Sequence, residues 1–283
     1  MYGLLYVQQV MERSKQGQGS GIIPAMSPLG WAVRIPWVLL LVAAPLGAQT
    51  PSPMPAPAQR QRAMLLESAS AGDRVGYYLY LPPAYDRDTT TRFPLLVFLH
   101  GIGERGNGTS ELPRVLKFGP PRSIERGRDF PFIIITPQLP ARAGHWPVAL
   151  VDDVIREANR IARVDSARIY LTGLSDGGDA SWNYAMAHPS VPAAIVPIAS
   201  EASPRGICAM RGVPVWAFHG ERDKDVKLAV EQRLVDALNA CQPPPDEPAR
   251  LTVYAGAGHL VWTRTYEGSD SVDIYAWLLA HHR

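Results

Sequence analysis

The stretch GLSDG at residues 173–177 stands between two segments of different character. The run RIYL before it, residues 168–171, is apolar and typical of a strand, whereas residues 180–187 after it are compatible with a helix. Glycine tolerates backbone angles that a Cβ would forbid, so the chain can turn sharply from strand to helix here. Such a turn holds the hydroxyl of Ser175 above the edge of a sheet and places the backbone N–H of Asp176 beside it.

Two later strand ends carry side chains that could activate a serine. Residues 213–218 form an apolar run, and the loop that follows contains Asp223 together with two competing carboxylates, Glu221 and Asp225. Residues 250–254 form the next strand-like run, and a glycine-rich turn then leads to His259. The order serine, acid, histidine is that of an α/β-hydrolase triad. Because the carboxyl ends of parallel strands meet at one edge of a sheet, we expect these side chains to lie together.

An earlier strand end predicts the donors of an oxyanion hole. Residues 94–99 are a continuous apolar run, as expected of a strand buried on both faces, and HGIGERG follows at residues 100–106. We assign one donor to the backbone N–H of Asp176 and the second to that of Ile102, with Gly103 as its nearest rival. The carboxylate of Asp176 is expected to turn away from the hole toward the start of its helix, where the helix dipole favours a negative charge.

Other side chains near these strand ends have more than one interpretation. The candidates for a substrate pocket are Gly103, Glu104, Trp146 and Trp262. Glu104 could instead pair with Arg105 at the surface, and the two tryptophans could instead belong to the core. His100 and His219 are interpreted as packing or loop-orienting residues rather than as bases, because neither follows the last strand.

The motifs together resemble a known family. They are LLVFLHGIGERG, FPFIIITPQLP, RIYLTGLSDGG, HPSVPAAIVPIAS, PVWAFHGERD and LTVYAGAGHLVWTRTY. From Asp73 to the C-terminus the chain is similar to exported serine esterases grouped with dienelactone hydrolases, polyhydroxybutyrate depolymerases and feruloyl esterases. The resemblance implies an esterase with nucleophile Ser175, base His259 and acid Asp223, since the family pattern His-Gly-x-x-Asp selects Asp223 among the loop carboxylates. Position 176 departs from the family, in which an apolar residue, often methionine, usually follows the nucleophile.

The order of the expected elements indicates the fold class. Strands and helices alternate from residue 74 onward, with helical stripes at residues 148–163 and 230–241 and a closing helix at 271–281. This alternation predicts an α/β-hydrolase fold, with a mostly parallel central sheet covered by helices on both faces. Only residues 199–212 separate the two strands after the nucleophile helix, which is too short for a helical lid, so we expect no large lid.

The N-terminal part of the chain has the character of a targeting segment. Residues 1–48 are interpreted as an extension and signal peptide, with Arg34 before an apolar run at 35–46 and small residues ahead of Gln49. Met26 is a possible true start. Residues 49–64 are expected to be a Pro/Ala-rich linker, and residues 65–283 the catalytic domain. The protein is therefore expected to be periplasmic or secreted, without a stable membrane span after cleavage.

Composition limits the partners and cofactors. The chain of 283 residues has 28 basic and 26 acidic side chains, so no nucleic-acid partner is implied. Neither a metal-spaced Cys or His cluster nor a phosphate-binding loop occurs in the sequence, so no metal and no cofactor are expected. Cys208 and Cys241 are the only cysteines. In an oxidising compartment they are expected to form a disulfide, with two free thiols as the alternative.

Three hypotheses for the function follow. The first is cleavage of a small-molecule or polymer-attached carboxylic ester through an acyl-enzyme. The second is peptide or amide hydrolysis by the same triad. The third is a catalytically weak ester- or carbohydrate-binding protein, which is motivated by the acidic Asp176.

Overall fold

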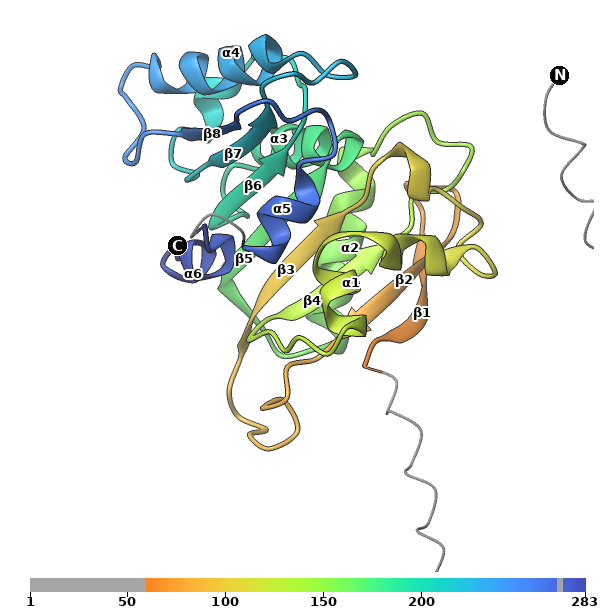
Figure 1. The fold of residues 1–283 in the computed structure, drawn as a ribbon. Coiled ribbons are helices and arrows are strands. Elements are labelled where there is room, and N and C mark those ends of the chain that lie inside the picture. The colour runs from red at the N-terminus through yellow and green to blue at the C-terminus, as the bar shows by residue number, and fades with distance from the viewer. Residues whose placement is uncertain (1–59, 269–271) are drawn as a thin grey trace, which may run out of the picture. The chain divides into compact units, whose positions relative to one another are not determined.

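Eight strands form one sheet in the order β1-β2-β4-β3-β5-β6-β7-β8 (Figure 1). The computed structural model describes residues 60–268 and 272–283. The strands are β1 (Arg62–Ser68), β2 (Asp73–Tyr80), β3 (Phe93–Leu99), β4 (Ile133–Pro137), β5 (Val164–Leu174), β6 (Ala194–Ile198), β7 (Trp216–Gly220) and β8 (Arg250–Tyr254). Strands β3 to β8 run parallel to one another, and β1 and β2 add two antiparallel strands at one edge.

In the part of the chain that the structure describes, six α-helices cover the sheet, three on each face (Figure 1). On one face lie α2 (Val148–Ile161), α3 (Asp176–Ala187) and α4 (Leu228–Asn239), and on the other lie α1 (Gly119–Glu125), α5 (Trp262–Glu267) and α6 (Ile274–Leu279). Each layer encloses its own apolar cluster. Strand β3 serves both clusters because its side chains alternate: Leu95 and Val97 pack on the α2 side, whereas Leu96 and Phe98 pack on the α5 side. The predicted mostly parallel, doubly covered sheet is thus confirmed.

The register of the parallel strands aligns their carboxyl ends. Leu99 of β3 pairs with Gly173 of β5, and Leu174 pairs with Ile198 at the end of β6. Gly220, the last residue of β7, pairs with Tyr254, the last residue of β8. The loops that leave these strands therefore emerge at one edge of the sheet, where the sequence places its candidate site residues.

Three boundaries differ from the sequence-based expectations. Residues 62–64, expected in the linker, are the start of β1, which pairs with β2 along its whole length. Strand β7 starts at Trp216 rather than residue 213, because Val215 makes only an isolated bridge. Helix α6 starts at Ile274, because the carboxylate of Asp273 accepts hydrogen bonds from the N–H groups of Tyr275 and Ala276 and caps the helix there.

The N-terminal expectations lie largely outside the described residues. The predicted extension and signal peptide, residues 1–48, and the linker up to residue 59 are among the residues that the structure does not describe. Within residues 60–268 and 272–283, none of the helices has the length and apolar content needed to cross a membrane.

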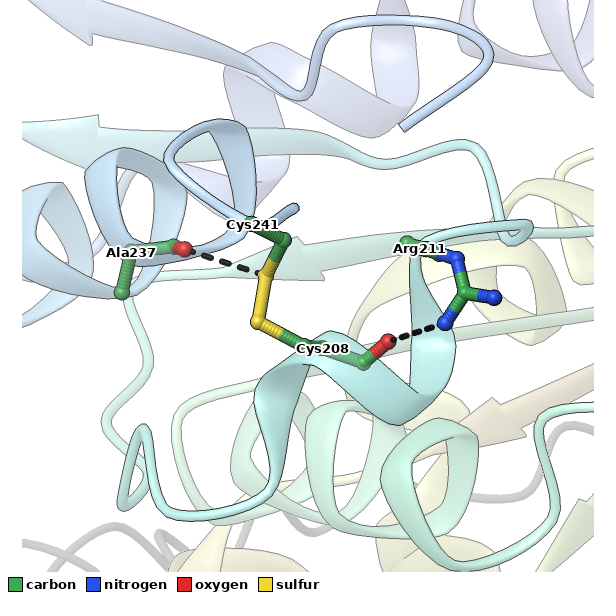
Figure 2. Close-up of a disulfide and its surroundings, with 4 residues drawn as sticks. All are labelled: Cys208, Arg211, Ala237 and Cys241. Carbon is green, nitrogen blue, oxygen red and sulfur yellow. Dashed lines mark hydrogen bonds between the residues drawn. A yellow bond between two sulfur atoms is a disulfide. The ribbon is translucent and has the colours of Figure 1, made fainter. Parts of the chain in front are cut away.

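The connection between β6 and β7 is short and is tied down by a disulfide. It contains one 3-10 helix, Ile207–Met210, and no longer helix, in keeping with the absence of a large lid from this connection. Figure 2 shows Cys208 of this 3-10 helix bonded to Cys241, which follows the end of α4, with 5.5 Å between the two Cα atoms. The bridge closes a loop across β7 and α4 near the start of β7, at the end of that strand away from Gly220.

Removing this bridge is expected to lower stability without changing the site. In the chain-entropy model a disulfide spanning 33 residues stabilises the folded state by about 3–4 kcal/mol. The double variant Cys208→Ser/Cys241→Ser should lose about that much free energy of unfolding in urea titrations. Wild-type protein kept in reductant is the matched control and should behave like the variant. Two titratable thiols in unfolded, unreduced protein would contradict the bridge.

Candidate active site

The turn between β5 and α3 holds Ser175 in a strained backbone conformation. Its φ is 52° and its ψ is −124°, which is rare for a residue with a Cβ. The N–H of Ser175 donates to the carbonyl of Ile198, 2.8 Å away, which fixes the turn against β6. A Cβ on Gly177 would lie 1.9 Å from the carbonyl oxygen of Leu99, so only glycine allows α3 to start this close to β3. The strain and the close approach together present the serine at the sheet edge.

The structure brings Ser175, His259 and Asp223 into one hydrogen-bonded chain. His259 Nε2 lies 3.1 Å from Ser175 Oγ, and His259 Nδ1 lies 2.7 Å from Asp223 Oδ2. The other carboxylate oxygen of Asp223 accepts the backbone N–H groups of Asp225 and Val226, each at 2.9 Å. The side chain of Asp223 is completely buried, whereas that of His259 is 13% exposed. The imidazole thus has an oriented acceptor on one side and a hydroxyl on the other.

The two competing carboxylates of this loop do not hold His259. Glu221 accepts the backbone N–H of Gly256 through Oε2 at 2.7 Å, which supports the turn before the histidine. Asp225 contributes its backbone N–H to Asp223. Among the residues that the structure describes, only Asp223, Asp225 and His259 form a group of acidic and histidine atoms close enough, within 4.8 Å, for a metal ion. Nδ1 of His259, the nitrogen that faces Asp223, already has Asp223 Oδ2 at 2.7 Å, so an ion there would displace that hydrogen bond, and the arrangement fits a hydrogen-bonded triad better than a metal centre.

The two predicted oxyanion donors each stand at the first position of a helix. Ile102 is the first residue of a 3-10 helix, Ile102–Glu104, and Asp176 is the first residue of α3. The first N–H groups of a helix have no partner within the helix, so both remain free to bind an oxygen from a substrate. A Cβ on Gly101 would lie 2.8 Å from the side chain of Leu174, so the Gly101 loop packs directly against the strand that carries Ser175.

His100 holds the Gly101 loop in place through hydrogen bonds of its buried ring. Its Nε2 accepts the backbone N–H of Leu139 at 2.9 Å, and its Nδ1 donates to the carbonyl of Gly101 at 2.6 Å. The indole N–H of Trp146 donates to the carbonyl of His100 at 3.1 Å. Burial lowers the pKa of His100 to about 4, so the ring is neutral and serves as a fixed connector. This agrees with its interpretation as a loop-orienting residue.

An acidic cavity of 340 Å³ lies next to the nucleophile turn. Its lining includes His145, Trp146, Asp176, Asp179, Asn183 and Glu201. The carboxylate of Asp176 does not cap its own helix: Oδ1 lies 2.8 Å from His145 Nδ1, a partner that the sequence did not indicate. Burial, together with the charges of Asp176, Glu201 and Glu231, raises the pKa of Asp179 to about 7. The cavity is therefore lined by several acidic side chains, and the charge of Asp179 among them changes near neutral pH.

The remaining pocket candidates have different surroundings. Trp146 lines the cavity, whereas Trp262 packs edge-on against the ring of His259, with 5.1 Å between ring centroids. The side chain of Glu104 is buried, 3.9 Å from Lys117, and burial raises its pKa. Arg105 donates to the carbonyl of Ala143, so the expected surface pair of Glu104 and Arg105 is wrong. A Cβ on Gly103 would have open space around it.

Behind Asp223 lie two buried charged residues. His219, at the end of β7, places Nε2 3.2 Å from Asp223 Oδ2. On its other side Nδ1 lies 2.5 Å from Glu231 of α4. The sequence marked His219 as loop-orienting, but it did not mark Glu231, which lies on a helix face where a glutamate ordinarily meets solvent.

Comparisons with known proteins place the fold among esterases of the α/β-hydrolase type. Residues 142–276 match the Dienelactone hydrolase family, and no curated protein matches the chain. A thermostable esterase superposes with a TM-score of 0.65 at 26% identity, over 79% of this chain and 64% of that one. A ferulic acid esterase superposes with a TM-score of 0.59 at 17% identity, over 77% and 98% of the two chains. Est1E from Butyrivibrio proteoclasticus superposes with a TM-score of 0.54 at 14% identity, over 77% of this chain and 99% of that one.

These similarities to solved structures differ in what they establish about this chain. This chain spans less than two thirds of the thermostable esterase, and the two neighbours below 25% identity establish the fold alone. The fold is that of α/β-hydrolase esterases, and the match of residues 142–276 to the Dienelactone hydrolase family agrees with the resemblance that the motifs carry.

The neutral state of His100 predicts a loss of stability in mild acid. Its folded pKa of about 4 lies below the ordinary 6.5, so between these pH values the unfolded chain binds a proton that the folded chain excludes. The free energy of unfolding should therefore fall by about 3 kcal/mol from pH 7 to pH 4 through this group. Urea titrations of wild type and His100→Gln at both pH values check this, because the variant lacks the titrating ring. An equal loss in both proteins would contradict it.

Proposed function

We propose that this protein hydrolyses carboxylic esters by a Ser175–His259–Asp223 triad through an acyl-enzyme. The observation that carries the proposal is the hydrogen-bonded chain from Ser175 Oγ through His259 to the buried Asp223, with the serine on a strained strand-to-helix turn. The dienelactone hydrolase family domain supports the same class of chemistry.

In the first half of the reaction the serine becomes acylated. His259 Nε2 accepts the hydroxyl proton as Ser175 Oγ attacks the ester carbonyl carbon. Asp223 keeps the other proton on Nδ1 and stabilises the imidazolium that forms. The carbonyl oxygen becomes an oxyanion, which the backbone N–H groups of Ile102 and Asp176 bind. When the tetrahedral intermediate collapses, the bond to the alcohol oxygen breaks and His259 returns its proton to the leaving alcohol.

In the second half water replaces the alcohol. His259 takes a proton from the water as its oxygen attacks the acyl carbon, and the same N–H groups bind the second oxyanion. Collapse then releases the carboxylic acid and restores the hydroxyl of Ser175. All the groups needed are present in the chain, so this route requires neither a metal nor a cofactor.

The surroundings of the triad favour a soluble or polymer-attached ester. Two of the exposed large apolar side chains flank the site: Ile102, 64% exposed, at the oxyanion loop, and Leu260, 71% exposed, next to the base. They offer an open apolar rim, while the cavity beside Asp176 receives one substituent of the ester. The Cys208–Cys241 bridge supports the proposal of an oxidising compartment, the periplasm or the outside of the cell, as the site of action.

The triad predicts a specific pattern of mutant rates. Ser175→Ala and His259→Ala should each reduce kcat for p-nitrophenyl acetate by about 10³-fold or more, and the double variant should be no worse, because the residues act as a unit. Asp223→Asn should lose about as much, since it would favour the wrong tautomer of His259. Asp225→Asn is the matched control and should retain nearly full activity. Wild-type rates in Asp223→Asn with a loss in Asp225→Asn would contradict the assignment of the acid.

The contact between Asp176 and His145 predicts that Asp176 is tolerated beside the oxyanion hole. Asp176→Asn keeps the backbone donor and an acceptor for His145 Nδ1, so kcat for a neutral ester should change by less than about threefold. Circular dichroism of the variant provides the control for folding. A gain of about tenfold or more would mean that the carboxylate opposes the oxyanion.

A further inference from the structure

A chain of buried polar contacts continues beyond the triad acid into the protein. Oδ2 of Asp223 faces two histidines, His259 at 2.7 Å and His219 at 3.2 Å. His219 Nε2 also donates to the carbonyl of Val226 at 3.0 Å, and its Nδ1 lies 2.5 Å from Glu231 Oε2. The side chains of His219, Glu231 and Asp223 are all fully buried. The buried side chains of Glu231, His219 and Asp223 therefore form a row that solvent does not reach and that ends at His259.

The contacts of His219 determine its protonation state. Each ring nitrogen faces only acceptors, a carboxylate at Nδ1 and a carbonyl with a second carboxylate at Nε2, so a hydrogen bond at both requires a proton on both. Although burial alone would lower the pKa of His219, the hydrogen bond and charge of Glu231 and the charge of Asp223 outweigh it and raise the pKa. With Glu231 ionised, the contacts on both sides of the ring therefore favour an imidazolium at His219.

Burial raises the pKa of Glu231, and the hydrogen-bond donors around its carboxylate act in the opposite direction. Its Oε1 accepts the hydroxyl of Ser200 at 2.5 Å and faces the indole N–H of Trp182 at 3.5 Å, and its Oε2 faces the backbone N–H of Ser200 at 3.3 Å. Donors of this kind favour a carboxylate over a carboxylic acid. Glu231 also lies in the first turn of α4, where the helix dipole favours a negative charge.

We propose that His219, held as an imidazolium by Glu231, is a positioning residue that fixes the triad acid and keeps His259 unprotonated to a lower pH. This inference rests on the proposed triad. Asp223 divides its charge between two cations when His259 is protonated, so it stabilises a protonated His259 less than an acid with a single histidine partner would.

Two other charged groups lie near this row. Asp225 lies close to His259, with ligand atoms within 4.8 Å. Asp179 of α3 feels the charge of Glu231 from the cavity side, so its pKa falls when that charge is removed. A shift of the acid limb in a Glu231 variant is therefore assigned to the Glu231–His219 ion pair only when the ring of His219 is shown to lose a proton in the same variant.

The test is the pH dependence of kcat/KM for p-nitrophenyl acetate, which reports the free enzyme. In Glu231→Gln the amide donates to His219 Nδ1, so His219 becomes neutral. We expect the pKa of the acid limb to rise by about 0.5–1 unit, which is a three- to tenfold loss of kcat/KM below the limb, with the alkaline plateau within about threefold of wild type. The double variant His219→Gln/Glu231→Gln should give the same shift and is used if the single variant does not fold.

Glu157→Gln is the matched control. Glu157 is also a buried helix carboxylate, but its partners are Tyr77 and Arg160, which do not touch the triad. Glu157→Gln should lower the free energy of unfolding and leave the pKa of the acid limb unchanged. A folded Glu231→Gln variant, verified by circular dichroism and its Tm, with the wild-type acid limb would overturn the inference.

A second readout does not depend on turnover. Nitrogen-15 spectra of the His219 ring in the Ser175→Ala protein should show a proton on both nitrogens at pH 8, and Glu231→Gln in the same background should remove one of them. If the Ser175→Ala protein with Glu231 intact showed one ring nitrogen of His219 without a proton, the proposed imidazolium would be wrong. If the wild-type protein did not hydrolyse esters at all, the proposed function would fail, but these spectra would still decide the state of His219.

Discussion

The structure of the site depends on one close backbone contact, between the start of α3 and the end of β3. A Cβ on Gly177 would lie 1.9 Å from the carbonyl oxygen of Leu99, so the helix can approach the strand only because residue 177 is glycine. At the same turn Ser175 has a φ of 52°, and a Cβ on Gly177 would also lie 2.8 Å from the carbonyl oxygen of His100, which precedes the Gly101 loop. The candidate nucleophile and the loop with the second candidate oxyanion donor therefore share one packing constraint.

Buried hydrogen bonds, rather than surface ion pairs, hold the rest of the site in position. His100 connects the Gly101 loop to Leu139 in the loop after β4, and Asp223 accepts two backbone N–H groups besides its contact with His259. Exposed ion pairs contribute little to stability, whereas a buried charge that loses its partner is strongly unfavourable. The row from Glu231 to His259 is therefore expected to have one arrangement in the folded protein.

The two sides of the site have opposite chemical character. On one side Ile102 and Leu260 present exposed apolar surface near the oxyanion loop and the base. On the other, Asp176, Asp179 and Glu201 line a cavity. There Nδ1 of His145 lies 2.8 Å from the carboxylate of Asp176. An ester bound between them would place one substituent against each, so the charge of the substituent in the cavity is expected to influence the choice of substrate.

The sequence by itself determined the elements whose signal is local. Buried strands such as β3 are continuous apolar runs, and the turn at residues 173–177 needs glycine for its backbone angles, so the order of the elements and the triad candidates were readable without coordinates. The tertiary structure alone decided β1, which is recognisable only by pairing with β2, and the contacts of Asp176 with His145 and of Glu231 with His219. Those partners lie 31 and 12 residues apart, and helix packing, which has no local pattern in the chain, brings them together.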